Sequence, residues 1–173
     1  MRRTIGLLCV AVLLGGAALA YADTRRGSRG PDRIRGTEGA DRIFGGDSGD
    51  RLAALGGDDY VSGGLDNDLI HGGNGDDLLE PGNGDDQVYG GPGNDRIIEK
   101  RFGDDVLRGG DGDDEIIGRR GSDQIFGGRG NDRITGGTGI DYMDCGPGRD
   151  TVYTNLKSER RRHIRNCERV IER

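Results

Sequence analysis

An aspartate recurs every nine residues along most of this chain. In the nonapeptide GGNGDDLLE, residues 72–80, the sixth position is Asp77. Steps of nine in either direction from Asp77 land on aspartate each time, once a single extra residue is placed at Glu99. The fourteen aspartates in this register are Asp32, Asp41, Asp50, Asp59, Asp68, Asp77, Asp86, Asp95, Asp105, Asp114, Asp123, Asp132, Asp141 and Asp150. Such regularity predicts a fold in which each nonapeptide is one structural unit.

Three other positions of the nonapeptide follow the same period. Position 8 always holds an aliphatic residue or methionine, from Ile34 to Val152, and position 4 is glycine except at Ser48 and Asp66. Position 1 is glycine apart from four residues, which are Ala54, Pro81, Lys100 and Cys145. An isolated repeat should stay disordered, because glycine costs backbone entropy and neighbouring carboxylates repel. Contacts between repeats must therefore stabilise the fold.

The composition leaves too few apolar residues for an ordinary globular core. Only 31% of the residues are hydrophobic, there is no Trp, and part of the apolar content lies at the N-terminus. Each repeat supplies one aliphatic side chain, which is buried only if successive turns stack. With about six residues of turn and three of strand per repeat, two repeats form one coil. The sequence predicts an all-β fold, a parallel β-roll (β-solenoid) of about seven two-repeat coils, roughly 30 Å long.

The repeats from Gly27 to Tyr153 resemble the haemolysin-type calcium-binding (RTX) nonapeptide repeat, G-G-x-G-x-D-x-U-x, in which U is a large apolar residue. The period, the glycines, the aspartates and the apolar positions all agree with this pattern. The resemblance implies a right-handed parallel β-roll over residues 27–153 that binds several calcium ions in its turns.

The charge of the repeats also favours calcium. Residues 27–153 contain 27 acidic and 14 basic side chains, a net charge of −13, and the roll would stack its position 6 carboxylates over one another. Calcium accepts six to eight oxygen ligands, backbone carbonyls included, in flexible geometry. The resemblance implies that each ion lies between neighbouring turns on the same side of the roll.

The expected ligands are position 6 aspartates and carbonyls of the glycine-rich turns. The expected aspartates are Asp68, Asp77, Asp86, Asp95, Asp105, Asp114, Asp123, Asp132, Asp141 and Asp150. The expected glycines are Gly73, Gly75, Gly91, Gly93, Gly110, Gly112, Gly128 and Gly130. An alternative is that the aspartates only form solvated turns, as Asp and Gly often do. Recurrence in all fourteen registers argues against that for the set, while it stays open for single repeats.

The repeats differ in how closely they keep the pattern. Four alternate repeats, GGNGDDLLE, GGPGNDRII, GGDGDDEII and GGRGNDRIT, fall on one side of the roll and keep it best. They are centred on Asp77, Asp95, Asp114 and Asp132, so we expect the tightest sites in that row. On the other side, GGLDNDLIH, KRFGDDVLR and GRRGSDQIF depart from the pattern, and weaker sites are expected there. The first repeats, with Pro31, Ala40 and Leu55 in their loops, should fold but bind metal less well.

The N-terminus predicts export. Residues 1–22 have Arg2 and Arg3, an apolar run to Leu14, and small residues before a cleavage point after Ala22 or Ala20. This order is typical of a secretory signal peptide. The run is short for a membrane anchor, so no membrane span is expected. We predict a secreted, extracellular protein, in a compartment where calcium is plentiful enough to fill weak sites.

Two cysteines remain after removal of the signal peptide. Cys145 opens the last repeat and Cys167 lies in the tail, so a disulfide between them is expected in an oxidising compartment. The basic tail, residues 154–173, would cap the end of the roll, as solenoids require. Leu156, Ile164, Val170 and Ile171 would cover the last aliphatic layer, from either a helix or a short strand. A basic cluster also occurs in nucleic-acid-binding proteins, but a cap is the preferred interpretation and no nucleic-acid partner is expected.

The sequence does not indicate catalysis. The two histidines, His71 and His163, have no catalytic neighbour at a recognisable spacing, and there is no nucleophile elbow, zinc motif or phosphate loop. Ice binding would favour a regular row of Thr or Asn, which position 3 does not provide. The predicted function is that of a secreted, non-catalytic protein whose roll folds on binding calcium. The alternative is a cell-surface adhesion protein or an envelope-associated scaffold with a partner that the sequence does not identify.

Overall fold

The computed structural model of the protein describes residues 22–154 and 163–172. Residues 1–21, 155–162 and 173 lie outside the described part, and with them almost all of the predicted signal peptide and Leu156 of the tail. Within the described residues, the chain consists of β-strands and turns without an α-helix.

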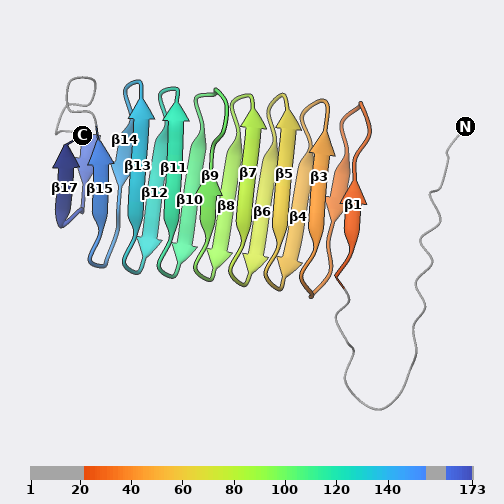
Figure 1. Ribbon diagram of the computed structural model, residues 1–173, viewed down its shortest axis with the longest axis horizontal. Coiled ribbons are helices and arrows are strands. Elements are labelled where there is room, and N and C mark those ends of the chain that lie inside the picture. Colours follow the sequence, from red (N-terminus) through yellow and green to blue (C-terminus); the bar gives the residue numbers. More distant parts are fainter. Residues whose placement is uncertain (1–21, 155–162, 173) are drawn as a thin grey trace, which may run out of the picture.

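Two parallel β-sheets face each other, and the chain passes from one to the other at every turn (Figure 1). Each strand pairs in parallel with the strand two further along the chain, so the coils stack along the long axis of the molecule. This is the parallel β-solenoid that the repeat predicts, with about 8 turns where about seven were expected. The all-β fold is therefore confirmed.

One sheet has nine strands and the other eight. The nine-stranded sheet contains β1 (Thr24–Arg26), β3 (Arg42–Gly46), β5 (Tyr60–Leu65), β7 (Leu78–Asn83), β9 (Arg96–Ile98), β11 (Glu115–Arg120), β13 (Arg133–Thr138), β15 (Thr151–Thr154) and β17 (Arg169–Glu172). The eight-stranded sheet contains β2 (Arg33–Arg35), β4 (Arg51–Gly56), β6 (Leu69–Asn74), β8 (Gln87–Pro92), β10 (Val106–Asp111), β12 (Gln124–Arg129), β14 (Tyr142–Asp144) and β16 (Ile164–Arg165).

The core is a ladder of position 8 side chains between the sheets. Equivalent repeat positions face one another across each strand pair, as Leu107 and Ile125 do between β10 and β12. Position 8 residues from Ile43 to Val152 are at most 1% exposed. Along each strand the buried residues alternate with outward ones, so one aliphatic side chain per repeat and the small residue at position 1 fill the interior.

The strands are longer than the three residues expected from the repeat. Most interior strands have six residues and run from position 7 of one repeat to position 3 of the next, as β6 does. The glycines at position 2 continue the ladder, because the paired Gly91 and Gly110 stay in register between β8 and β10. The expected division into six turn and three strand residues was therefore wrong.

The described residues of the tail form strands, which settles the choice between helix and strand. β16 pairs with β14, and β17 pairs with β15, so each sheet gains one more strand. Ile164 packs against the core cluster. Val170 pairs with Val152 at the end of the nine-stranded sheet and is 44% exposed.

Among the described residues, five other than glycine have a positive φ, and four of them replace a glycine of the repeat. They are Ser48, Leu55, Asp66, Arg119 and Asn166. Leu55 has the largest φ of these residues, 90°. A side chain in this region of backbone conformation costs roughly 1–2 kcal/mol, because the Cβ atom crowds the following carbonyl.

We expect the substitution Leu55→Gly to relieve this strain. The matched control is Leu65→Gly, which makes the same exchange at a position that has no positive φ and is 44% exposed. In calcium-saturated protein, Leu55→Gly should be more stable than Leu65→Gly by about 1 kcal/mol, since only the first exchange removes strain. Urea unfolding of both variants measures the difference. A Leu55→Gly variant as unstable as the control would show that the left-handed backbone at this position is not strained.

Candidate metal centre

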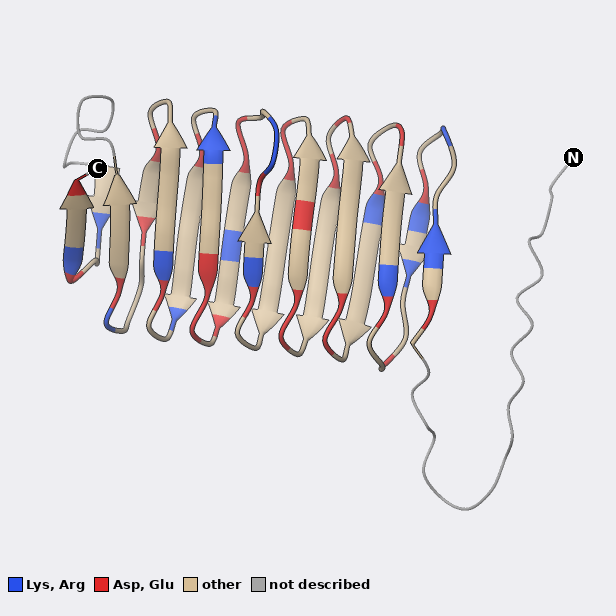
Figure 2. Ribbon diagram, in the orientation of Figure 1, with Lys and Arg blue, Asp and Glu red and all other residues tan. Residues whose placement is uncertain are grey.

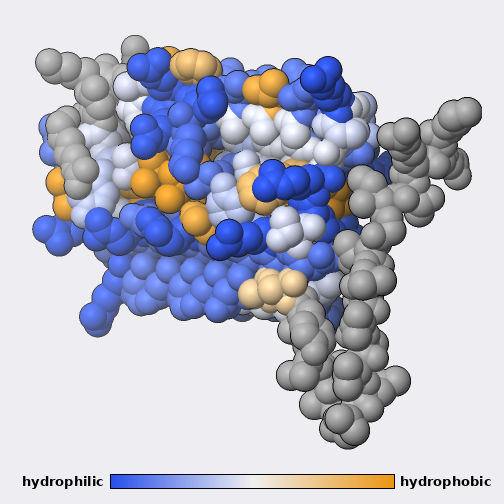
Figure 3. Space-filling view, turned by 45° about the vertical axis from the view of Figure 1, so that its right-hand side comes forward, coloured by the Kyte–Doolittle hydropathy of each residue, from blue (hydrophilic) through white to orange (hydrophobic). Residues whose placement is uncertain are grey.

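Acidic residues lie along both edges of the roll, at the turns (Figure 2). Each position 6 aspartate immediately precedes a strand, so alternate aspartates stack on the same edge. The odd row, which precedes the odd-numbered strands, contains Asp41, Asp59, Asp77, Asp95, Asp114, Asp132 and Asp150. The even row contains Asp32, Asp50, Asp68, Asp86, Asp105, Asp123 and Asp141. One long edge of the molecule is hydrophilic along most of its length in Figure 3.

Backbone hydrogen bonds link the aspartates of each row. The amide of Asp95 donates to Oδ1 of Asp114 at 2.8 Å, and the amide of Asp114 donates to Oδ1 of Asp132 at 2.9 Å. The same bond recurs along the even row, for example from Asp105 to Asp123 at 3.0 Å. Each carboxylate is therefore held in place by the aspartate of the preceding coil on its own side.

The second carboxylate oxygen, Oδ2, is buried and has no hydrogen-bond donor in most of these aspartates. The atoms concerned are the Oδ2 of Asp50, Asp59, Asp68, Asp77, Asp86, Asp95, Asp105, Asp114, Asp123, Asp132, Asp141 and Asp150. Their side chains are at most 4% exposed. A buried carboxylate oxygen without a partner is costly, so the donor set fits a cation that accepts oxygen ligands. All ten aspartates expected from the sequence belong to this group.

Without a bound cation, burial disfavours the charged form of the aspartates in both rows. Burial raises the pKa of Asp77 to about 7 and the pKa of Asp114 to about 8. At Asp114 the amide of Asp95 opposes this rise in pKa, while the carboxylates of Asp95 and Asp132 add to it. The pKa of Asp123 is raised to about 8 in the same way, first by burial. Protons or cations must therefore neutralise the rows when the roll forms.

Without calcium, the roll is expected to be more stable at low pH. The folded pKa values of about 6 to about 8 exceed the ordinary aspartate value of 3.8, so folding takes up protons. This stabilisation is complete below about pH 4 and is lost as the pH rises through about 6 to 8. Circular dichroism of protein stripped of calcium should show β-structure increasing on acidification. An unchanged coil spectrum from about pH 8 down to about pH 4 would contradict the expected proton uptake.

The first two aspartates of the register differ from the others. Oδ2 of Asp32 accepts hydrogen bonds from the amide and hydroxyl of Ser28, and Oδ2 of Asp41 accepts them from Thr37. These carboxylates complete local turns in the way that short polar side chains commonly do. Weaker metal binding therefore stays a prediction for the repeats of Asp32 and Asp41, whereas Asp59 in the repeat of Leu55 keeps a buried Oδ2 without a donor.

The turn glycines leave room for the oxygens of neighbouring coils. The eight glycines expected at the metal sites, at positions 2 and 4, all have a positive φ. At position 1, a Cβ added to Gly90 would overlap Oδ2 of Asp95 and lie 2.6 Å from the carbonyl oxygen of Gly109. Glycine is therefore needed both for the backbone conformation and for the space that carboxylate and carbonyl oxygens occupy.

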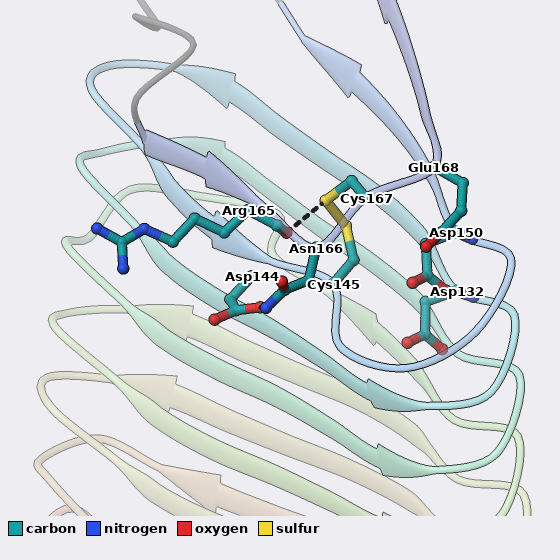
Figure 4. The surroundings of a disulfide bond; sticks show 8 residues. All are labelled: Asp132, Asp144, Cys145, Asp150, Arg165, Asn166, Cys167 and Glu168. Carbon is teal, nitrogen blue, oxygen red and sulfur yellow. Dashed lines mark hydrogen bonds between the residues drawn. A yellow bond between two sulfur atoms is a disulfide. The ribbon is translucent and has the colours of Figure 1, made fainter.

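The odd row extends one aspartate and one glutamate beyond the expected series. The amide of Asp23 donates to Oδ1 of Asp41 at 2.7 Å, and the amide of Asp150 donates to Oε2 of Glu168 at 2.8 Å. Figure 4 shows Asp132, Asp150 and Glu168 one after another on the same side of the roll. One more step of nine before Asp32 reaches Asp23, so the sequence carried this signal. Glu168 lies two steps of nine after Asp150 and is a glutamate in place of an aspartate, so the register alone did not predict it.

Glu99 occupies a different position from the one expected. Its amide donates to the carbonyl oxygen of Ile117, the bond that position 1 residues such as Gly36 make. Glu99 therefore takes the position 1 place instead of Lys100, and the extra residue lies after it. Its side chain is 0% exposed, and Oε1 accepts the amides of Lys100 and Arg101 at 2.5 Å each. Placing the extra residue at Glu99 itself was wrong.

The expected disulfide between Cys145 and Cys167 is present, with 5.2 Å between the Cα atoms. Figure 4 shows that it joins the turn after β14 to the segment between β16 and β17. Cys145 is fully buried and belongs to the core cluster, and Cys167 packs against that cluster. The bridge therefore attaches the last strands to the end of the roll.

A parallel β-roll with rows of buried, unpaired aspartate oxygens along its edges defines a class of repeat proteins built to bind cations. The model of the RTX calcium-binding nonapeptide repeat family matches residues 20–52, 44–79, 62–97, 102–134 and 126–156. The chain belongs to this family. A search of curated proteins found no match. Among the residues that the structure describes, no helix has the length and apolar character needed to cross a membrane.

Proposed function

We propose that this chain is a secreted, non-catalytic protein whose roll folds as it binds several calcium ions in both rows of turns. The observation that carries the proposal is the set of buried aspartate Oδ2 atoms without donors. Calcium suits them because it accepts several oxygen ligands, including backbone carbonyls, and tolerates irregular geometry. The aspartates from Asp68 to Asp150 would supply charged ligands, and the turn glycines from Gly73 to Gly130 would supply carbonyl oxygens.

Secretion is supported by two features of different kinds. The first 22 residues have the order of charged, apolar and small residues that is typical of a signal peptide. The disulfide Cys145–Cys167 is of the kind that persists in oxidising compartments. Extracellular calcium would then neutralise a roll whose repeats carry a net charge of −13.

Native mass spectrometry of the purified chain tests the proposal directly. We expect several calcium ions to bind to each molecule, and magnesium at the same concentration to bind in fewer copies. Magnesium demands near-octahedral geometry and gives up its water reluctantly, so it suits a loose set of carbonyls poorly. A chain that binds no calcium, or that binds both metals equally, would contradict the proposed function.

A further inference from the structure

Three buried carboxylates meet at one place in the even row. One oxygen from each of Asp86, Glu99 and Asp105 lies within 4.8 Å of the other two. Asp86 and Asp105 are consecutive aspartates of the row and are 1% exposed, and Glu99 is 0% exposed. Among the described residues, this is the one place where three His, Cys, Asp or Glu side chains lie close enough together to hold a metal ion.

The hydrogen bonds at this place leave oxygens free. Oδ1 of Asp86 accepts the amide of Asp68 at 2.7 Å, and Oδ1 of Asp105 accepts the amide of Asp86 at 2.8 Å. Both Oδ2 atoms are buried without a donor. Oε1 of Glu99 caps the following loop, but the donor at Oε2, the amide of Gly82, is 3.4 Å away. The two unsatisfied aspartate oxygens therefore lie beside a third buried carboxylate, and this arrangement favours the binding of a cation.

The extra residue explains how a long side chain fits here. At an ordinary position 1, such as Gly90 or Gly109, a Cβ would overlap Oδ2 of the aspartate five residues later. Asp105 comes six residues after Glu99 instead of five, so the turn is wider. The family model passes over this stretch, since its matched segments end at residue 97 and resume at 102. The insertion thus accompanies a long carboxylate side chain at a position that elsewhere holds glycine or, in three repeats, Ala54, Pro81 or Cys145.

Basic side chains do not neutralise the cluster within the described part of the chain. The described ion pairs include none with Asp86, Glu99 or Asp105. Lys100 instead pairs with Glu80 at 2.5 Å. Arg119 is the basic residue whose charge acts on Glu99, and it lies on the exposed surface. Three like charges at this spacing favour a cation more strongly than two do.

We propose that Glu99 is a calcium ligand and that the site between Asp86 and Asp105, with three carboxylates, binds calcium most tightly in the whole roll. Affinity in calcium sites rises with the number of charged ligands. The inference rests on the proposed calcium-binding function. It also reverses the expectation that the widened repeat KRFGDDVLR carries a weak site.

Calorimetric calcium titration of the full chain and two variants tests the role of Glu99. Glu99→Gln keeps the shape of the side chain and removes its charge, and we expect the tightest class of ions to bind about tenfold more weakly. The control Glu115→Gln removes the same charge from a partly exposed residue on β11 that pairs with Arg96. It should leave the tightest class unchanged. Equal binding by the wild type and Glu99→Gln would overturn the inference.

Diffraction from calcium-bound wild-type crystals tests the same site without any substitution, in case Glu99→Gln does not fold. An ion between Asp86 and Asp105 should have a Glu99 oxygen at about 2.3–2.6 Å. An ion there without Glu99 among its ligands would refute the assignment of Glu99. The absence of an ion there while other turns hold calcium would also refute it, and neither result would contradict the proposed calcium binding of the roll. A wild-type chain that binds no calcium would overturn the proposed function as well.

Discussion

Removal of calcium from the purified protein is expected to abolish most of its β-structure, and calcium at millimolar concentration is expected to restore it. The roll has one aliphatic side chain per repeat for a core, so apolar burial alone is a small stabilising contribution. Against it stand buried carboxylates such as Asp95 and Asp114, which need a counter-charge before the coils can stack. Metal binding and folding should therefore be one event. Circular dichroism with excess chelator, and then with calcium, measures the change.

Two controls separate calcium binding from general screening. Sodium chloride at the same ionic strength screens charges that lie at the surface but satisfies no buried oxygen, so it should restore little β-structure. Magnesium should restore less than calcium, because of its rigid octahedral shell. A full β-spectrum in chelator at neutral pH would show that something other than metal compensates the charge of the rows.

The substitution Asp114→Ala is expected to raise the calcium concentration needed for half-folding much more than Asp41→Ala does. Asp114 lies between Asp95 and Asp132 in the odd row, and its unpaired Oδ2 could serve an ion on either side. Oδ2 of Asp41 is already bonded to Thr37. We expect a shift of about five- to tenfold for Asp114→Ala and less than about twofold for Asp41→Ala, since only the first removes a charged ligand.

Calcium titrations followed by circular dichroism compare the two variants. Asp114→Asn is the informative companion, because the amide oxygen can still accept the hydrogen bond from Asp95 while the charge is lost. If Asp114→Asn behaves like Asp114→Ala, the loss of charge explains the shift. Equal midpoints for the two alanine variants, or a larger shift for Asp41→Ala, would show that the order of the sites is wrong.

The sequence predicts the roll well because the nine-residue period and the alternation of side chains along a strand together determine where each repeat position lies. Nine residues bring the chain from one sheet to the other, so every second aspartate must fall on the same edge, as Asp77 and Asp95 do. Position 8 points inward in each repeat, which fixes the core from Ile43 to Val152. The disulfide between Cys145 and Cys167 followed from the cysteine count and the predicted compartment.

Local departures from the repeat were harder to predict from the sequence. The nine-residue register places the extra residue at Glu99. The backbone of Glu99 instead makes the position 1 hydrogen bond, and the residues that follow it form a wider loop. Glu168 lacks a repeat around it, and only the pairing of β17 with β15 brings it to the end of the odd row. Strand length was missed because glycine has a low strand propensity, which the ladder between Gly91 and Gly110 overrides.

The hydrogen bonds along each row have a direction, which makes the two ends of the roll unequal. The position 6 amides from Asp32 to Asp132 donate forward, to the carboxylate one coil nearer the C-terminus, and in the odd row the described series ends with Asp150 donating to Glu168. If a coil is lost from the N-terminal end, the carboxylate of the next coil loses its amide donor, and water or an ion can replace that donor. A coil lost from the C-terminal end leaves buried amides such as that of Asp132 without an acceptor, which is costly. Because a chain is synthesised from its N-terminus, the amides of each coil lack their acceptors until the next coil follows, and in the odd row Glu168 is the last acceptor among the described residues.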